Sequence, residues 1–454
     1  MYLAYNTVAM EKLGKPVVMT CMKLFYDDAR SAAARKGMAT LRILPTPLTQ
    51  RPEGEALRAG VSAIINDIVT ALTKPLTAEE KSPAKEERKP ARIIFKGNLQ
   101  EVNWFFYKRG WAYGMPIIPP TEEAVAEMLK GTDLPGDHVV AKIPPRFGKA
   151  TVEKIAVNSV MAGALPTYMP VLIAAVQALV DPGWYADCYT ASIASLAPFW
   201  IINGPIRHDL HIHSGVSLMT PEWKANAAIA HAMGLIIKNL GGVRPGVEDM
   251  GAMGHEGKYN LCIAENEEES PWEPLHVEQG LKKEDSAVTV FFPNARSWLV
   301  HYGQDADGIL RALCRIPYQG HLLGFGGMIM SPENAKGLAN GGWTKKEVIS
   351  YVRENARAPA HSVGLPSERQ GGSMWTPKEL MPVDPNFAVR LITTQKTFES
   401  FEPIRIIVAG RILTILYSGF MPHYGGWITK KIELPANWDQ LVKKYKDIVP
   451  TYAH

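Results

Sequence analysis

Cysteine is scarce in this chain, and its cysteines lie far apart. Among 454 residues there are four, with no C-x-x-C pair: Cys21, Cys188, Cys262 and Cys314. This spacing argues against a disulfide framework and a zinc ribbon, and it fits a reducing cytoplasm. Ligand sets are scarce too: His211 and His213 offer two ligands, where a zinc site needs three or four. No metal and no cofactor is therefore expected.

Excess charge and long apolar runs are also lacking. The formal net charge of +4 is too small to argue for nucleic acid or for an anionic membrane as a partner. There is no apolar run of about 18 residues free of charges and helix breakers. The first residues lack the basic and apolar regions of a signal peptide. These absences predict a cytoplasmic protein that acts on a small molecule, without membrane contact.

The order of predicted elements divides the chain into two α/β parts. Residues 1–74 read as helix, strand, helix, strand, helix, which is the rhythm of a parallel sheet with covering helices. This unit is flavodoxin- or Rossmann-like but incomplete, because an opening strand is missing. Residues 75–92 are rich in Lys, Glu and Pro and are predicted to be a linker. Residues 93–454 are predicted to form a larger α/β domain that binds the substrate.

The larger domain shows helical patterns separated by short buried strands, with no internal repeat evident. A run of apolar residues around Val171 predicts a buried helix. Helices are predicted over 121–130, 151–162, 170–180, 223–240, 307–316, 331–339 and 344–356, and strands over 199–203, 287–292, 322–330 and 404–410. Residues 357–384, rich in Pro, Gly and Ser, are predicted to be a long loop.

The most informative stretch is 258–280, which holds six glutamates, Lys258, Cys262 and His276. Two prolines and Trp272 interrupt it, so it is not one continuous helix. We expect a short apolar segment, then a polar loop with a fixed backbone, where sites are commonly built. For most single residues here, a surface loop with capping carboxylates is an equally good interpretation.

A second polar cluster follows a predicted strand at Asn203. The Gly-Pro step after it allows a sharp turn, so that Arg207 can pair with a carboxylate or phosphate. Asn226 faces either a ligand or a neighbouring carbonyl, and both remain open. Cys262 is favoured as a buried structural cysteine, because the nearby carboxylates raise the pKa of a thiol.

Four segments of the chain resemble the UGSC-family (seleno)proteins. They are 109–123, 150–163, 203–207 and the two ends of 257–278, and the likeness extends from Ala4 to Ile428. The resemblance implies a small N-terminal domain that carries selenocysteine or cysteine in a U/C-G-S-C motif. It also implies redox chemistry of the thiol type in a largely uncharacterised family.

The chain departs from that pattern at its start. The family motif lies at the end of an opening strand just before the first helix, and here the chain begins at that helix. We expect either that the reading frame starts upstream of Met1, or that this subunit has lost the redox centre. A smaller departure is His213, where the family is expected to carry Asn.

These observations predict a thiol-dependent oxidoreductase acting on a small polar or anionic substrate, with its thiol or selenol centre missing from this chain. The alternatives are a non-redox lyase or hydratase that uses carboxylate and histidine chemistry, and a non-catalytic subunit of a redox complex. Its protein partner would be either further copies of the same chain, in a homo-oligomer, or a small thiol protein. The expected catalytic residues are Glu265, Glu267 and His276. The expected substrate-binding residues are Asn203, Arg207, Ser214, Asn226, Lys258, Tyr259, Asn266 and Glu278.

Overall fold

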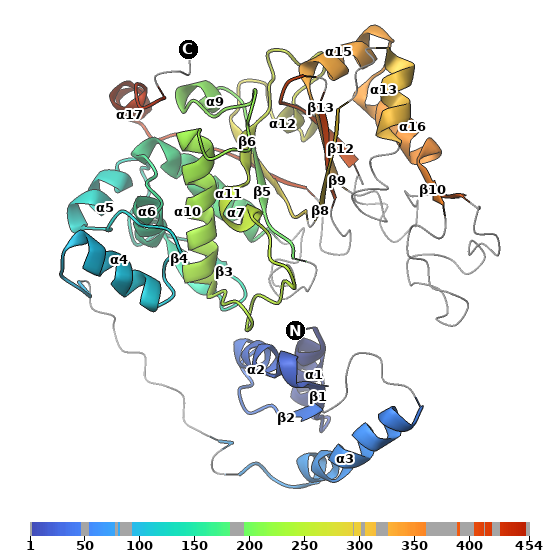
Figure 1. The fold of residues 1–454 in the computed structure, drawn as a ribbon. Coiled ribbons are helices and arrows are strands. Elements are labelled where there is room, and N and C mark those ends of the chain that lie inside the picture. The colour runs from blue at the N-terminus through green and yellow to red at the C-terminus, as the bar shows by residue number, and fades with distance from the viewer. Residues whose placement is uncertain are drawn as a thin grey trace.

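The computed structural model mixes helices and strands, which confirms the predicted α/β class (Figure 1). It describes residues 2–46, 54–77, 80–81, 93–181, 195–293, 295–300, 305–314, 326–359, 388–390, 404–412, 414–419 and 427–450. Most of the predicted linker and most of the predicted loop over 357–384 lie outside these residues. Residues 322–325 of one predicted strand lie outside them as well.

The N-terminal part folds in the predicted order. Its elements are α1 (Tyr2–Lys12), β1 (Met19–Met22), a 3₁₀ turn (Lys23–Phe25), α2 (Tyr26–Arg35), β2 (Ile43–Thr46) and α3 (Gly54–Thr73). The two strands are parallel, with Met19 opposite Ile43. Their small core consists of Ala4, Val8, Met19, Ala29, Ala32, Ala33, Leu41 and Ile43.

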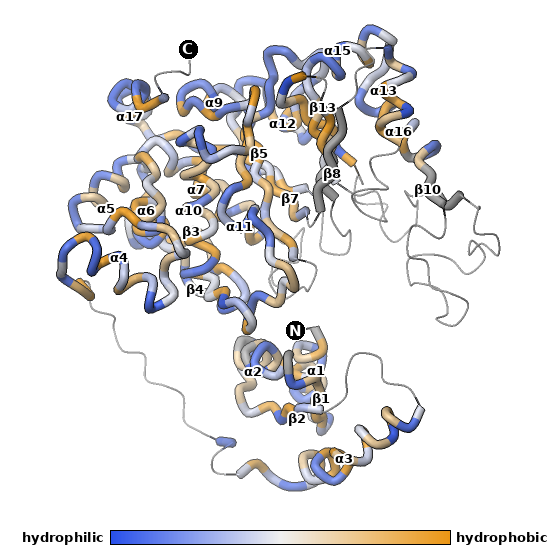
Figure 2. The backbone as a smooth tube through the Cα atoms, viewed as in Figure 1, coloured by the Kyte–Doolittle hydropathy of each residue, from blue (hydrophilic) through white to orange (hydrophobic). Residues whose placement is uncertain are grey.

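The long helix α3 contributes almost nothing to this core, since Gly60 is its only buried residue among those described. By length and composition, α3 is apolar enough to cross a membrane, although Arg58 and Asp67 lie within it. From the sequence, α3 was not predicted as a span because its apolar run is interrupted by these charges. In Figure 2 the helix carries many apolar residues along its length.

The larger part contains two four-stranded mixed sheets. The first has the order β14-β7-β5-β6 and the second β12-β9-β13-β8. The strands of the first are β5 (Phe199–Asn203), β6 (Cys262–Ala264), β7 (Ala287–Phe291) and β14 (Ile428–Lys431). Those of the second are β8 (Ala295–Val300), β9 (Gly326–Met330), β12 (Ile404–Val408) and β13 (Thr414–Gly419). Two small pairs stand apart: β3 (Val139–Ile143) with β4 (Gly148–Thr151), and β10 (Arg357–Pro359) with β11 (Ala388–Arg390).

The two sheets repeat one topology. In each, a central strand pairs with a parallel edge strand and an antiparallel neighbour, so that β5, β6 and β7 correspond to β9, β12 and β13. The fourth strand is exchanged: β8 follows β7 but joins the second sheet, and β14 follows β13 but joins the first. No repeat was evident in the sequence, because corresponding strands share only their apolar character.

Side chains on the two faces of each sheet enter different cores. Trp200 and Ile202 of β5 pack against helices, whereas Phe199 and Ile201 pack against the second sheet through residues such as Ile407. This alternation follows from the period of two in a strand. Both faces of each sheet are therefore covered, which explains strands that are apolar throughout.

The result is four layers: helices, sheet, sheet, helices (Figure 1). The first sheet is covered by α7 (Met169–Leu179) and α10 (Lys224–Gly241), and α6 (Val152–Met161) packs on these helices with α5 (Glu122–Leu129) on its outer side. The second is covered by α13 (Ala306–Leu313), α15 (Pro332–Asn340) and α16 (Lys345–Asn355). The remaining helices are α4 (Leu99–Lys108), the 3₁₀ turn Pro166–Tyr168, α9 (Ile206–Asp209), α11 (Gly257–Asn260), α12 (Leu275–Glu278) and α17 (Trp438–Tyr445).

Candidate functional site

Most predicted site residues meet at the carboxyl ends of β5, β6 and β12. Asn203 ends β5 and Glu265 follows β6, and these strands are parallel neighbours. The Asn266 N–H donates to the carbonyl of Val408, the last residue of β12, over 2.7 Å. Such strand ends are common sites of ligand binding in α/β proteins. We call the group formed by Asn203, Arg207, Glu265, Glu267, His276 and Lys345 the polar cluster.

Glu265 lies at the centre of the polar cluster and is fully buried. Its carboxylate accepts hydrogen bonds from Asn203 Nδ2 at 2.7 Å, from the Leu275 N–H at 2.7 Å and from the Val408 N–H at 3.5 Å. Lys345 Nζ lies 3.6 Å from Oε1 of this carboxylate and forms an ion pair with it. A carboxylate with this many internal partners joins four segments of the chain. Its geometry favours a structural role over proton transfer.

Arg207 is 5% exposed and points into the glutamate-rich loop. Its Nη1 donates to the Glu265 carbonyl at 2.8 Å, and its Nε donates to the Gly204 carbonyl at 2.9 Å. Nε also lies 3.1 Å from Glu267 Oε1, and Nη2 lies 2.8 Å from Glu268 Oε1. Arg207 and Glu265 therefore lie together, as the sequence predicts. The guanidinium, however, already pairs with the chain itself rather than offering a free fork to a substrate.

The histidine of the polar cluster is fully enclosed. His276 is 0% exposed, its Nδ1 lies 3.9 Å from Glu267 Oε1, and that nitrogen has no hydrogen-bond partner. Nearby, Glu278 forms a 2.8 Å ion pair with Lys345. Burial raises the pKa of Glu278, and Lys345 opposes this rise.

Two further predicted residues act as braces at the edge of this region. The Asn226 side chain bonds both the N–H and the carbonyl of His213, at 2.9 and 3.0 Å, and donates to the Cys262 carbonyl at 3.0 Å. The Ser214 carbonyl accepts the Gly410 N–H at 2.8 Å. Of the two interpretations left open for Asn226, the structure shows bonding to neighbouring carbonyls.

The pairing of Glu268 gives a prediction for stability against pH. Arg207 holds the pKa of Glu268 down to about 2, assisted by His208. A depressed folded-state pKa contributes stability above the unfolded value of about 4.3, and this stability is lost as pH falls towards 2. We expect Glu268→Gln to flatten the acid limb of the stability curve in urea titrations between about pH 5 and about pH 2. An unchanged acid limb would contradict this pairing.

Lys258 and Tyr259 do not join the polar cluster. They belong to α11, which precedes β6, whereas Glu265 follows that strand. The two groups therefore lie at opposite ends of β6. The carbonyl of Lys258 instead accepts a 3.4 Å hydrogen bond from the hydroxyl of Tyr113, and the rings of Tyr113 and Tyr259 lie 6.3 Å apart.

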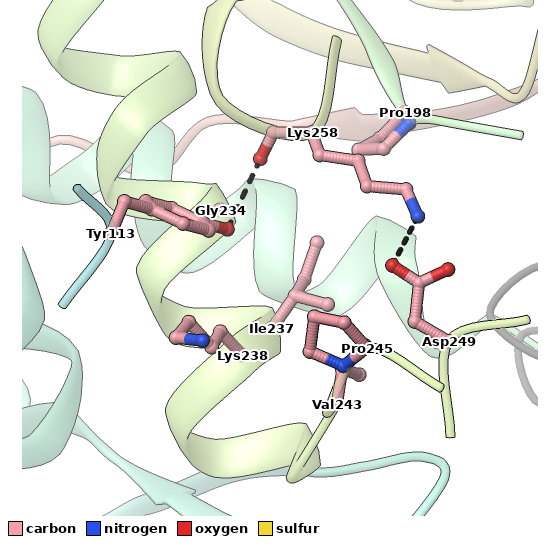
Figure 3. Close-up of a pocket in the computed structure, with 9 residues that line it drawn as sticks. All are labelled: Tyr113, Pro198, Gly234, Ile237, Lys238, Val243, Pro245, Asp249 and Lys258. Atoms are coloured by element: carbon pink, nitrogen blue, oxygen red, sulfur yellow. Dashed lines mark hydrogen bonds and ion pairs between the residues drawn. The ribbon is translucent and has the colours of Figure 1, made fainter. Parts of the chain in front are cut away.

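A cavity beside α10 surrounds Lys258 (Figure 3). It has a volume of about 50 Å³, and its lining consists of Tyr113, Pro198, Gly234, Ile237, Lys238, Val243, Pro245, Asp249 and Lys258. A water molecule occupies about 30 Å³ of liquid, so this volume admits a group the size of a carboxylate. We call it the α10 cavity. Of this set only Lys258 was predicted from the sequence, although Tyr113 lies in a segment that carries the UGSC resemblance.

The α10 cavity has an apolar floor and charged walls. Figure 3 shows Lys258 Nζ pointing at Asp249, with which it forms an ion pair, while Tyr113 and Lys238 lie on the other side. Burial, together with the charge of Asp249, raises the pKa of Tyr113, so its hydroxyl stays protonated and acts as a donor.

Lys238 is the cation of the α10 cavity that has no ion-pair or hydrogen-bond partner within the residues described. Its Nζ lies 5.4 Å from the centre of the Tyr113 ring. Burial lowers the pKa of Lys238, and the charge of Asp249 opposes this. Two turns away from Lys238 on the same face of α10, His231 has a buried Nε2 without a hydrogen-bond partner, and burial lowers its pKa.

Gly234 permits the close contact between α10 and the segment of Lys258. A Cβ at this position would lie 2.3 Å from the Lys258 carbonyl oxygen and 3.0 Å from the Tyr113 hydroxyl. We therefore expect Gly234→Ala to displace Lys258 and to cost roughly 1–3 kcal/mol, as overpacking does. Thermal unfolding measures this cost, and because alanine has the higher helix propensity, a loss of stability is due to the close contact. A Gly234→Ala variant with wild-type stability would contradict the contact.

Comparison with protein-family models, with curated proteins and with solved structures finds no match to the chain. Among the residues that the structure describes, no group of three or more His, Cys, Asp or Glu side chains is placed to hold a metal ion.

Proposed function

We propose that this protein is an enzyme of the acid–base type, such as a lyase or hydratase, that binds a small carboxylate in the α10 cavity. The observation that carries the proposal is Lys238, a partly buried cation that lines the cavity and forms no ion pair in the described part of the chain, since Asp249 pairs with Lys258. The lining holds two positive charges, those of Lys238 and Lys258, and one negative charge, that of Asp249. An anionic group would complete the pairing.

The groups needed for proton transfer stand around the same cavity. Asp249 is its carboxylate, oriented by Lys258, and Tyr113 supplies a protonated hydroxyl. A carboxylate base and a hydroxyl donor on two sides of a bound anion are suited to removing a proton beside a carboxyl group. The apolar floor of Ile237 and Val243 limits water around that proton.

Thiol redox chemistry, implied by the UGSC resemblance, stays a prediction that the described cysteines do not favour. Cys262 is buried, and burial raises the pKa of its thiol. Burial also raises the pKa of Cys21, in the N-terminal part. A reactive cysteine needs a depressed pKa, which neither of these two has.

Replacing Lys238 by methionine should weaken the binding of small dicarboxylates about 10- to 100-fold. A hydrogen bond to a charged group is worth about 1.5–3 kcal/mol. Isothermal titration with oxalate, malonate and succinate measures this effect, and Lys346→Met on the exposed face of α16 is the matched control. Because Lys238 must be protonated to bind, the affinity should fall with rising pH already below the usual lysine pKa. Equal affinity in both variants would reject the site.

Catalysis is tested separately by solvent exchange. We expect the enzyme to exchange a C–H proton beside the carboxyl group of its substrate for deuterium in D₂O, observed by proton NMR across small 2-hydroxy and 2-keto acids. Asp249→Asn should stop this exchange, and prior treatment with iodoacetamide should not. Exchange that iodoacetamide abolishes would instead support thiol chemistry.

A further inference from the structure

The helix α3 exposes a stripe of large apolar side chains. These residues are spaced by four, four, four and three positions, and 41–51% of each is exposed: Leu57, Val61, Ile65, Val69 and Leu72. The adjacent stripe, formed by Gly60, Ile64 and Ile68, is the one that turns towards β2 and is buried or half-buried. The exposed stripe is therefore a second apolar face that the N-terminal part of the chain leaves uncovered.

The small core of the N-terminal part makes this exposure costly. Eight residues form that core, four of them are alanines, and no apolar side chain of α3 is among them. Units of this size commonly gain stability from oligomerisation when the core is insufficient. A 20-residue helix that places only Gly60 in the interior needs another surface for its apolar face.

The spacing of the stripe fits a second copy of the same helix. Residues at intervals of four form a ridge that packs into the corresponding groove of another helix, the commonest class of helix packing. The stripe is also symmetric about Ile65, with Val61 and Val69 on either side and Leu57 and Leu72 at its ends. A twofold axis at Ile65 brings each residue opposite an equivalent apolar one, which is the requirement of an isologous interface.

The charges of α3 argue against a lipid surface as the occupant. Within Gly54–Thr73 the charged residues are Glu55, Arg58 and Asp67, so the helix has a single basic residue and a net negative charge. Helices that lie on membranes carry many Lys and Arg residues on the polar face, which attract anionic lipids. We propose that the exposed stripe of α3 is covered by the same stripe of a second copy, in a homodimer whose two α3 helices cross at Ile65.

Sedimentation velocity on the full chain tests the dimer. We expect the wild-type protein to sediment with twice the mass of one chain, and Ile65→Lys to sediment as a monomer with an unchanged far-UV circular dichroism spectrum. Ala63→Lys, on the exposed face away from the stripe, is the matched control and should remain a dimer. A monomeric wild type over the micromolar range, or equal loss of mass in both variants, would overturn the proposal.

A cross-linking experiment covers the case in which Ile65→Lys fails to fold. With the two copies crossing at this residue, Ile65→Cys should form an intermolecular disulfide under mild oxidation, whereas Ala63→Cys and the wild type should not. Flotation with vesicles of phosphatidylcholine and phosphatidylglycerol tests the lipid alternative. Vesicle binding that Ile65→Lys abolishes would show that a membrane, not a second copy, covers the stripe.

Discussion

Replacing Glu265 by alanine is expected to lower the free energy of unfolding by about 3 to 5 kcal/mol. The change removes the acceptor of two buried backbone N–H groups, those of Leu275 and Val408. Each donor left without a partner costs about 1–3 kcal/mol, and the space of the lost side chain adds to this. Urea unfolding followed by circular dichroism measures the effect.

Glu268→Ala provides the comparison for that experiment. Glu268 is a neighbouring carboxylate in the same loop, but about half of its side chain is exposed. Pairs at exposed positions contribute about 1 kcal/mol or less. If Glu265→Ala were as stable as Glu268→Ala but lost activity, Glu265 would be a catalytic residue, as the sequence suggested, rather than a structural one.

The second large effect is expected for Arg207→Ala, at about 3–5 kcal/mol. This substitution leaves the buried Glu267 without its cation and removes the donor to the carbonyls of Gly204 and Glu265. Breaking a buried ion pair by removing one partner is costly because the other charge stays buried. Urea unfolding of the wild type and the variant at neutral pH measures this loss of stability.

His208→Ala is the matched control for Arg207, because both residues contact Glu268 Oε1 and they are adjacent in α9. The His208 side chain is mostly exposed, so its loss should change stability by little. An Arg207→Ala variant with wild-type stability but weakened dicarboxylate binding would show that the polar cluster, not the α10 cavity, is the binding site.

The meeting of Arg207 and Glu265 could be predicted from the sequence for a simple reason. Each follows a short apolar segment; the segment before Arg207 was predicted as a strand, and the structure shows that the one before Glu265 is the parallel neighbour of that strand. The order of the N-terminal elements followed in the same way from helical and strand periodicity. Local patterns were sufficient in both cases.

What each polar residue does at that edge could not be predicted. Whether Glu265 faces a ligand or the chain depends on the N–H groups of Leu275 and Val408, and the latter lies 143 positions away. Lys258 was grouped with Glu265 because they are close in sequence. The three-residue strand β6 between them carries them to opposite ends of the sheet.

The α10 cavity was missed because its walls come from separate parts of the chain. Tyr113, Lys238 and Asp249 have no common motif, and only folding brings them around Lys258. The duplicated sheet topology was missed for a related reason, because strand exchange separates β14 from the rest of its sheet. β7 ends at Phe291 and β14 begins at Ile428, more than 130 residues later. Pairing at such distances leaves no local pattern.

The most direct test of the binding site is anomalous diffraction from crystals soaked in sodium bromide. The account predicts a bromide ion beside Lys238 Nζ in the α10 cavity, absent from crystals of Lys238→Met under the same soak. An empty cavity together with a bromide ion on Arg207 would contradict it, and would return the site to the polar cluster.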